Sequence, residues 1–303
     1  MRTLLYKIYV SIRWLFQWLG LMGWAERSLP IMRATKWMRE RIAGGNIVII
    51  TESTCGNRMY VNPYYVDLIK GRGYHQGTTK LFTDFIESGM TVVDVGANIG
   101  YFTLLAARLV GEKGKVFAFE PEPENYALLT KNIEINDYKN VTAMQKAASN
   151  KTGQVELFLD KVQTTTHTIL RVRGETCEES IAVDAVSLDE FFKGKERLID
   201  VIKIDVEGAE MLVLLGMTKI LKSNDNLKVF TEFWPQGLEK AGFSPEEYVN
   251  KLVQSGFEYI YLIDELGQPL EKVDFEAIIR HCKRSLLKQS LSVNLLCTKV
   301  PLQ

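Results

Sequence analysis

Apolar segments of strand length alternate along the chain with longer segments of helical periodicity. Five apolar runs predict buried strands, at residues 91–95, 116–119, 141–145, 201–204 and 227–233. Helices are predicted between and after them, at residues 99–109, 123–135, 207–215 and 245–254. Closing strands are expected at 257–263 and 291–298, and shorter strand-like pieces at 152–160 and 181–188 flank a polar loop. This alternation predicts one open, mostly parallel α/β sheet with helices on both faces.

The first part of the chain has a different pattern. Residues 4–24 read LLYKIYVSIRWLFQWLGLMGW, and a helix of this sequence gathers six apolar side chains on one face. They are Leu5, Ile8, Ile12, Leu15, Phe16 and Leu19. Basic residues and tryptophans accompany this face, which predicts peripheral contact with a membrane surface through residues 1–25. A helix packed on the protein's own core or on a second subunit is the alternative. Arg13 disfavours both a signal peptide and a membrane span.

Three segments are expected along the chain. Residues 1–45 form a basic amphipathic helical extension, because they hold eight basic and two acidic side chains. Residues 46–66 alternate in the manner of a hairpin, so 46–77 is interpreted as a hairpin-like lead-in. The catalytic domain is expected at 78–303.

Composition excludes some classes of partner. The formal net charge is +0, but the chain after residue 45 has 29 basic and 35 acidic side chains. Such an acidic body does not suit a phosphate backbone, so no nucleic-acid partner is expected. The four cysteines are far apart and form no CxxC pair. This argues against a disulfide framework or a zinc site and favours a reducing, cytoplasmic compartment.

The first chemical motif is VVDVGANIGYF, residues 92–102. A buried strand ends at Asp94, and a turn containing Gly96 and Gly100 lets the backbone approach a ligand before a helix begins. Asn98 replaces the middle glycine of a dinucleotide fingerprint, and a GxxxxGK phosphate loop is also missing. An acid at the strand end disfavours a pyrophosphate and suits a cationic ligand. S-adenosylmethionine, with its ammonium and sulfonium groups, is such a ligand.

A second motif, FAFEPEPEN at residues 117–125, places Glu120 at the end of the next strand, twenty positions after Gly100. An acid at this position can accept hydrogen bonds from both hydroxyls of a ribose. The two motifs together predict a nucleoside-containing ligand.

A third motif, DVIKIDVEGAEMLVLLGM at residues 200–217, follows the same logic at the fourth strand. Asp205 and Glu207 come at its carboxyl end, where ligands of open α/β sheets bind, and Gly208 allows a close approach. The alternative interpretation is structural, with Asp205 capping the next helix and Glu207 and Glu210 complementing its dipole.

Together these segments resemble the FkbM family of methyltransferases. The resemblance rests on VVDVGANIGYFTLLAA, FAFEPEPENYALLTKNIEIN, KAASNKTGQVELF, SLDEFF, IKIDVEGAE and FTEF, and it extends from about residue 76 to about residue 298. It implies a Rossmann-like class I methyltransferase fold with a seven-stranded sheet, S-adenosylmethionine as cofactor, and methylation of a hydroxyl, commonly on a sugar or a polyketide.

The resemblance also implies a cofactor site. Its expected residues are Asp94, Gly96, Asn98 and Gly100 at the methionine end, Glu120 at the ribose and Ala147 near the adenine.

Methyl transfer to a hydroxyl requires positioning of the acceptor and removal of its proton. The candidate bases are Asp205, Glu207 and Glu232 at strand ends, and His167 in the polar loop. The three acids could instead hold Mg²⁺, but the sequence has no dense acidic cluster, so no metal is expected.

Three functions remain open on this basis. The leading hypothesis is an O-methyltransferase for a sugar hydroxyl in a glycan or glycolipid. The others are a methyltransferase for a soluble secondary metabolite and a catalytically silent scaffold held at a membrane.

Overall fold

The computed structural model describes residues 49–53, 55–61, 69, 75–159, 167–170, 179–195, 198–264, 270–286 and 292–302. The chain divides into two compact units, residues 1–74 and 75–303. In the first unit, β1 (Ile49–Glu52) and β2 (Arg58–Val61) pair antiparallel, as the alternation at 46–66 predicts.

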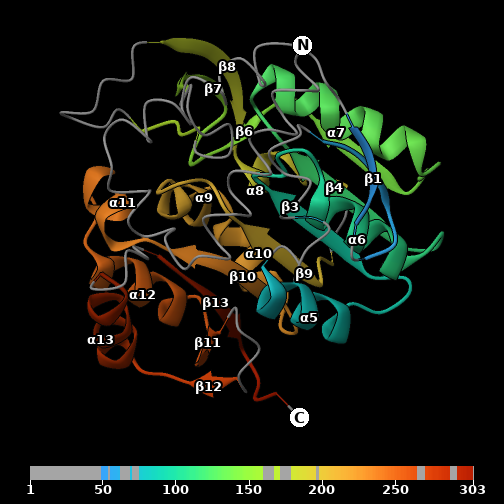
Figure 1. Ribbon diagram of the computed structural model, residues 1–303. Helices are drawn as coiled ribbons and strands as arrows, with labels where there is room; N and C mark the ends of the chain where they lie inside the picture. Colours follow the sequence, from blue (N-terminus) through green and yellow to red (C-terminus); the bar gives the residue numbers. More distant parts are fainter. Residues whose placement is uncertain are drawn as a thin grey trace, which may run out of the picture. The chain divides into compact units, whose positions relative to one another are not determined.

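The second unit is built on one large sheet with the strand order β12-β11-β13-β10-β9-β3-β4-β5 (Figure 1). Its strands are β3 (Thr91–Val95), β4 (Lys115–Phe119), β5 (Val141–Met144), β9 (Val201–Ile204), β10 (Lys228–Phe233), β11 (Tyr259–Ile263), β12 (Glu271–Lys272) and β13 (Val293–Thr298). The five strands from β10 to β5 are parallel, and β13 runs antiparallel between β10 and β11. The seven predicted strands are therefore present, and β12 adds a two-residue edge.

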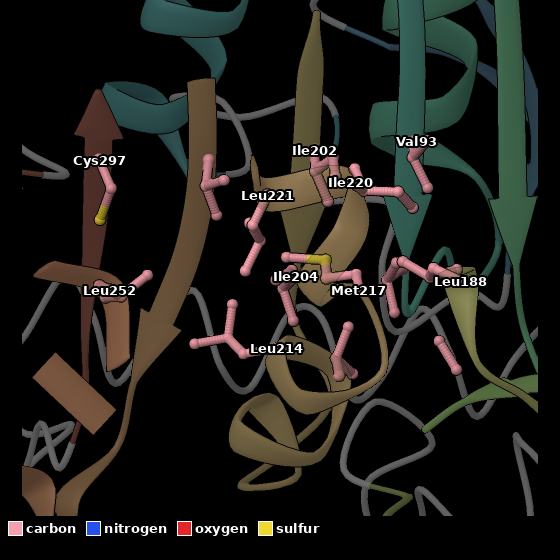
Figure 2. Packing of buried hydrophobic residues seen from close by; sticks show 14 of the residues in the cluster. Val93, Leu188, Ile202, Ile204, Leu214, Met217, Ile220, Leu221, Leu252 and Cys297 are labelled. Atoms are coloured by element: carbon pink, nitrogen blue, oxygen red, sulfur yellow. The ribbon is translucent and has the colours of Figure 1, made fainter. Parts of the chain in front are cut away.

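Helices cover both faces of this sheet, as predicted. They are α5 (Gln76–Phe85), α6 (Tyr101–Val110), α7 (Pro123–Ile135), α8 (Leu188–Phe191), α9 (Glu210–Leu215), α10 (Thr218–Ser223), α11 (Pro235–Lys240), α12 (Pro245–Gln254) and α13 (Phe275–Leu286). On one face, α9, α10 and α12 bury their apolar side chains against β3, β9 and β10 (Figure 2). On the other face, Phe82 of α5 contacts Phe230 of β10, and Leu129 of α7 packs with Ala118 of β4.

A second, three-stranded sheet has the order β6-β8-β7. It contains β6 (Ala147–Ala148), β7 (Gly153–Phe158) and β8 (Ser180–Val186), with β7 antiparallel and β6 parallel to β8. The strand-like pieces predicted on either side of the polar loop therefore pair with each other outside the main sheet.

Two helices begin later than predicted, for the same physical reason. Asn98 has φ 50 and Gly100 has φ 97, so α6 starts at Tyr101. Glu207 has φ 54 and Gly208 has φ 96, so α9 starts at Glu210. A residue in the left-handed region cannot continue a right-handed helix. Both positions turn the chain sharply at the carboxyl end of a central strand.

Within the described residues, none of the helices has the length and apolar character that crossing a bilayer requires. The amphipathic segment 4–24 lies outside the described residues. Its contact with a membrane surface stays a prediction.

Packing on the α9 face of the sheet provides a test of the fold. Leu214 is fully buried there, between β9 and α12 neighbours. We expect Leu214→Ala to lower the free energy of unfolding by about 2–5 kcal/mol, because it removes buried methyl groups and leaves a cavity. Urea unfolding followed by circular dichroism measures this. Leu198 is 69% exposed, so Leu198→Ala is the matched control and should change stability by less than about 0.5 kcal/mol. Equal losses in the two variants would contradict the assigned core.

Candidate functional site

The loops that follow β3 and β9 meet where the strand order reverses, at the place where open α/β sheets bind ligands. Gly96 in the first loop has φ 79, and a Cβ added there would lie 1.9 Å from the carbonyl oxygen of Asp205 in the second loop. Only glycine allows this approach. The backbones of the two sequence motifs are therefore in direct contact.

Asp94, one residue before the end of β3, has a buried carboxyl group. Its Oδ2 accepts a hydrogen bond of 2.6 Å from Thr103 Oγ1 on α6, whereas Oδ1 is buried and has no hydrogen-bond partner among the described residues. Burial raises the pKa of Asp94, and the nearby charge of Lys203 opposes this rise. A cationic ligand would both pair with Oδ1 and favour the ionised acid.

Glu120 connects the loops after β3 and β4. Its Oε2 accepts the backbone N–H of Asn98 at 2.8 Å, and its Oε1 accepts that of Glu122 at 2.9 Å. Burial raises the pKa of Glu120 to about 7, while these two hydrogen bonds oppose the rise. Each carboxylate oxygen keeps a second acceptor site. The predicted ribose ligand is thus also the residue that holds Asn98 in its turn, which the sequence motif did not indicate.

Ala147 lies in β6, opposite Ala185 of β8, and is buried with Leu157 and Val183. The structure places this predicted adenine neighbour in the small second sheet. His167 also belongs there, because the next residue, Thr168, forms a bridge with Phe158 at the end of β7.

Lys203, which was not predicted as a site residue, is a buried cation in the centre of the sheet. It lies on β9, opposite Asp94 of β3 and Phe230 of β10. Its Nζ is 2.9 Å from Asp205 Oδ2 and 4.9 Å from the centre of the Phe102 ring. Burial alone would lower the pKa of Lys203, but the charges of Asp205 and Asp94 outweigh burial and raise it. The signal in the sequence is a lysine inside the otherwise apolar run VIKI.

Asp205, Glu207, Glu210 and Glu232 gather at the carboxyl ends of β9 and β10, because the charge of Asp205 acts on the other three, and the charges of Glu210 and Glu232 act on Glu207. Burial followed by the charge of Glu232 raises the pKa of Glu207 to about 9. Burial followed by the charge of Asp205 raises the pKa of Glu232 to about 8. Burial also raises the pKa of Glu210 to about 7. Asp205 differs: burial would raise its pKa, but Lys203 outweighs burial and lowers it.

The environment therefore separates one ionised acid, Asp205, from two acids, Glu207 and Glu232, that hold protons at neutral pH. Such a separation of pKa values is typical of sites that perform proton transfer.

The capping interpretation of the third motif needs a correction. The N-cap residue of α9 is Ala209, and no side chain caps it. Asp205 instead bonds Lys203. Glu210 stabilises the turn, because its Oε1 accepts the backbone N–H groups of Val206 at 3.2 Å and Gly208 at 3.1 Å. Its Oε2 is buried without a hydrogen-bond partner among the described residues.

His75, at the start of α5, faces the same acidic group and was also not predicted. Its charge favours ionisation of Asp205 and Glu232. Its Nδ1 is 3.4 Å from Nδ2 of Asn294, which lies opposite Glu232 on β13. No signal in the sequence indicated this role of His75, because its contact with Asn294 joins segments 219 residues apart.

Across the part of the chain that the structure describes, no three histidine, cysteine, aspartate or glutamate side chains are arranged to hold a metal ion.

The strand order, the glycine turn after β3 and the acid after β4 define a Rossmann-like fold of the class that binds a nucleoside cofactor. The family model for the methyltransferase FkbM domain matches residues 94–259, more than half of the chain. The chain belongs to this family. The domain is thereby a methyltransferase domain with S-adenosylmethionine as methyl donor. The unpaired Oδ1 of Asp94 and the glycine turn fit a cationic cofactor of this kind.

Curated relatives are similar over part of their length. The chain is 32% identical over 175 residues to "Methyltransferase sdnD" of Sordaria araneosa, covering 46% of this chain and 66% of that protein. It is 30% identical over 150 residues to "Hexuronic acid methyltransferase AglP" of Haloferax volcanii, covering 49% and 58%. The chain thus spans less than two thirds of each relative.

Among solved structures, a putative rRNA-methylase from Clostridium thermocellum is similar with a TM-score of 0.45 and 14% identity, covering 75% of this chain and 95% of that chain. The strand order of this chain by itself defines the Rossmann-like fold.

The raised pKa of Glu207 generates a prediction about stability. In the unfolded chain this carboxyl ionises near pH 4.5, but in the folded protein it ionises near pH 9. Folding therefore takes up a proton between these values, and the free energy of unfolding falls as the pH rises through this window. We expect Glu207→Gln to raise Tm at pH 8 by at least about 2–4 °C, the shift that about 1 kcal/mol produces.

The same variant should have no effect on Tm at pH 4, where both states are protonated. Glu239→Gln is the matched control, because Glu239 is exposed on α11. A difference in Tm that is the same at both pH values, or that Glu239→Gln reproduces, would contradict the assigned burial.

Proposed function

We propose that the protein is an S-adenosylmethionine-dependent O-methyltransferase that acts on a sugar hydroxyl in a glycan or glycolipid. The observation that carries this proposal is the carboxyl group of Glu232. It is half-buried at the end of β10, its Oε2 has no hydrogen-bond partner among the described residues, and its pKa is about 8. A carboxyl group with this pKa is suited to accept the proton of a hydroxyl at neutral to mildly alkaline pH.

The bound cofactor would supply a methyl group on a sulfonium centre. Asp94 would hold its cationic methionine end, with the turn from Gly96 to Gly100, and Glu120 would accept hydrogen bonds from its ribose. Lys203 keeps Asp205 ionised, which adds negative charge near that end. These residues bind and orient; none of them needs to change its covalent state.

Glu232 performs the proton transfer in this proposal. Methyl transfer from the bound cofactor would require the acceptor hydroxyl to lose its proton, and Glu232 Oε2 would accept that proton. Glu207 lies near enough to Glu232 for the Glu232 charge to raise the pKa of Glu207, so it would position the acceptor or share the proton. The ionised carboxylate of Asp205 also favours a neutral acceptor over an anionic one, because like charges repel in a partly buried site.

The relatives support a sugar acceptor only in general terms. The printed name of the Haloferax volcanii relative describes a hexuronic acid methyltransferase, and that of the Sordaria araneosa relative gives no acceptor. Incubation with methyl-labelled S-adenosylmethionine and a panel of neutral sugars, uronic acids and aromatic alcohols distinguishes the proposed function from its alternatives. Label only in aromatic alcohols favours a secondary-metabolite enzyme, and no label in any acceptor favours a silent scaffold.

We expect Glu232→Gln to lower kcat by about 10²- to 10⁴-fold, the range that general-base catalysis contributes. With saturating S-adenosylmethionine, the wild type should lose activity as the pH falls below about 8, because Glu232 must be ionised to accept a proton. S-adenosylhomocysteine binding, measured by calorimetry, should be retained in Glu232→Gln. Glu120→Ala is the matched contrast and should weaken that binding by about 1.5–3 kcal/mol. Unchanged turnover in Glu232→Gln would remove Glu232 from the mechanism.

We also propose that residues 1–25 hold the enzyme at a membrane surface on the cytoplasmic side. The support is the apolar face and the basic residues of this segment. The full-length protein should sediment with anionic liposomes at low salt and less at high salt. Binding that survives deletion of residues 1–25 would refute this role.

A further inference from the structure

Five buried side-chain atoms at the carboxyl ends of β3, β9 and β10 and in the segments that follow have no hydrogen-bond partner among the described residues. They are Asp94 Oδ1, Glu210 Oε2, Glu232 Oε2, Trp234 Nε1 and Gln236 Oε1. Buried polar atoms in native proteins are nearly always paired, so a local concentration of unpaired ones needs an explanation. The first two belong to side chains that are 1% and 0% exposed.

The stretch from Glu232 to Gln236 alone contributes three of these atoms, at every second position. Glu232 is the last residue but one of β10, Trp234 follows the strand in extended conformation, and Gln236 is in the first turn of α11. The indole N–H is a donor, the Gln236 oxygen is an acceptor, and a carboxyl group with a pKa of about 8 serves as either. A sugar matches this set, because each of its hydroxyls both donates and accepts.

Backbone contact brings this stretch beside the loop after β9. A Cβ added to Gly208 would lie 3.0 Å from the Cα of Gly237, and a Cβ added to Gly237 would lie 2.3 Å from Cε3 of Trp234. The indole therefore lies over the first turn of α11, next to the point where the two loops touch. Trp234, Gly208 and the adjoining Glu207 are thus parts of one surface.

We propose that Trp234 and Gln236 form the acceptor subsite and bind a neutral pyranose. The indole N–H donates to one ring hydroxyl, and Gln236 Oε1 accepts from another. The indole ring itself already carries the Lys240 ammonium 5.1 Å from its centre and packs against Gly237, so the N–H is the group left to bind the sugar. The ionised carboxylate of Asp205 disfavours a uronic acid at the same place. This inference rests on the proposed function and adds the residues that select the acceptor.

Trp234 also supplies a direct signal for the test. It is the only tryptophan after residue 37. The full chain with S-adenosylhomocysteine is titrated with methyl glucoside, methyl mannoside and methyl galactoside, and with methyl glucuronoside for comparison. The emission of Trp234→Phe is subtracted from that of the wild type. We expect at least one neutral glycoside to change the remaining signal to saturation, and the glucuronoside to do so more weakly.

Kinetics of Gln236→Leu then separates binding from folding. Loss of one hydrogen bond should raise the KM for the acceptor by about 2- to 12-fold. Because Gln236 Oε1 has no partner among the described residues, removing it should leave Tm unchanged or raise it. Gln254→Leu is the matched control, since Gln254 is exposed at the end of α12, and it should leave KM unchanged.

The outcomes distinguish this subsite from the function on which it rests. Methylation of a sugar with no response of Trp234 to any glycoside overturns the subsite and leaves the proposed function standing. So does a Gln236→Leu variant with a lower Tm and an unchanged KM. Saturable binding of glycosides at Trp234, without transfer of label to any sugar, supports the subsite and contradicts the proposed function. Stronger binding of the glucuronoside than of every neutral glycoside overturns the assignment of a neutral acceptor.

Discussion

The buried ion pair between Lys203 and Asp205 is the interaction on which the polar end of the sheet depends. Lys203 lies on the central strand β9, with Asp94 opposite it on β3 and the Phe102 ring over its ammonium. An ammonium group leaves water only where opposite charges offset the loss of hydration. The acids that surround Lys203 provide that offset, and Lys203 in turn keeps Asp205 ionised. Without Lys203, Asp205 would lose the cation that its carboxylate pairs with.

Two strained turns flank this ion pair, and each is held by a buried glutamate. Asn98 and Glu207 both have positive φ, a conformation that costs a non-glycine residue free energy. Glu120 accepts the N–H of Asn98, and Glu210 accepts the N–H groups on both sides of Glu207. Their carboxyl groups therefore support the shape of the loops that meet at Gly96 and Asp205. Strain of this kind persists where the surrounding structure enforces it, and it is concentrated at functional sites.

The acids with raised pKa values show the usual conflict between stability and function. The ionised carboxyl groups of Glu207 and Glu232 would each have a lower free energy in water than at the strand ends, because burial is the largest cause of their raised pKa values. A protein that retains such groups gives up stability for chemistry that needs a proton acceptor tuned above the ordinary range of a carboxylic acid. The buried atoms of Trp234 and Gln236 that have no hydrogen-bond partner among the described residues also cost stability, in the segment that follows β10.

Local pattern by itself determined the order of the elements and much of the cofactor loop. The apolar runs predicted both ends of β3 and of β9 correctly. Strands that are buried on both faces have nearly continuous apolar sequences, so their first and last residues are easy to identify. The glycines and acids after β3 and β4 identified the loop, since close backbone approach demands glycine wherever it occurs. Only the tertiary structure decided which acid is ionised, which caps a turn, and that His75 and Trp234 adjoin the same strand ends. Those properties depend on burial and on charges from segments far apart in the sequence, and neither is set until the strands pair.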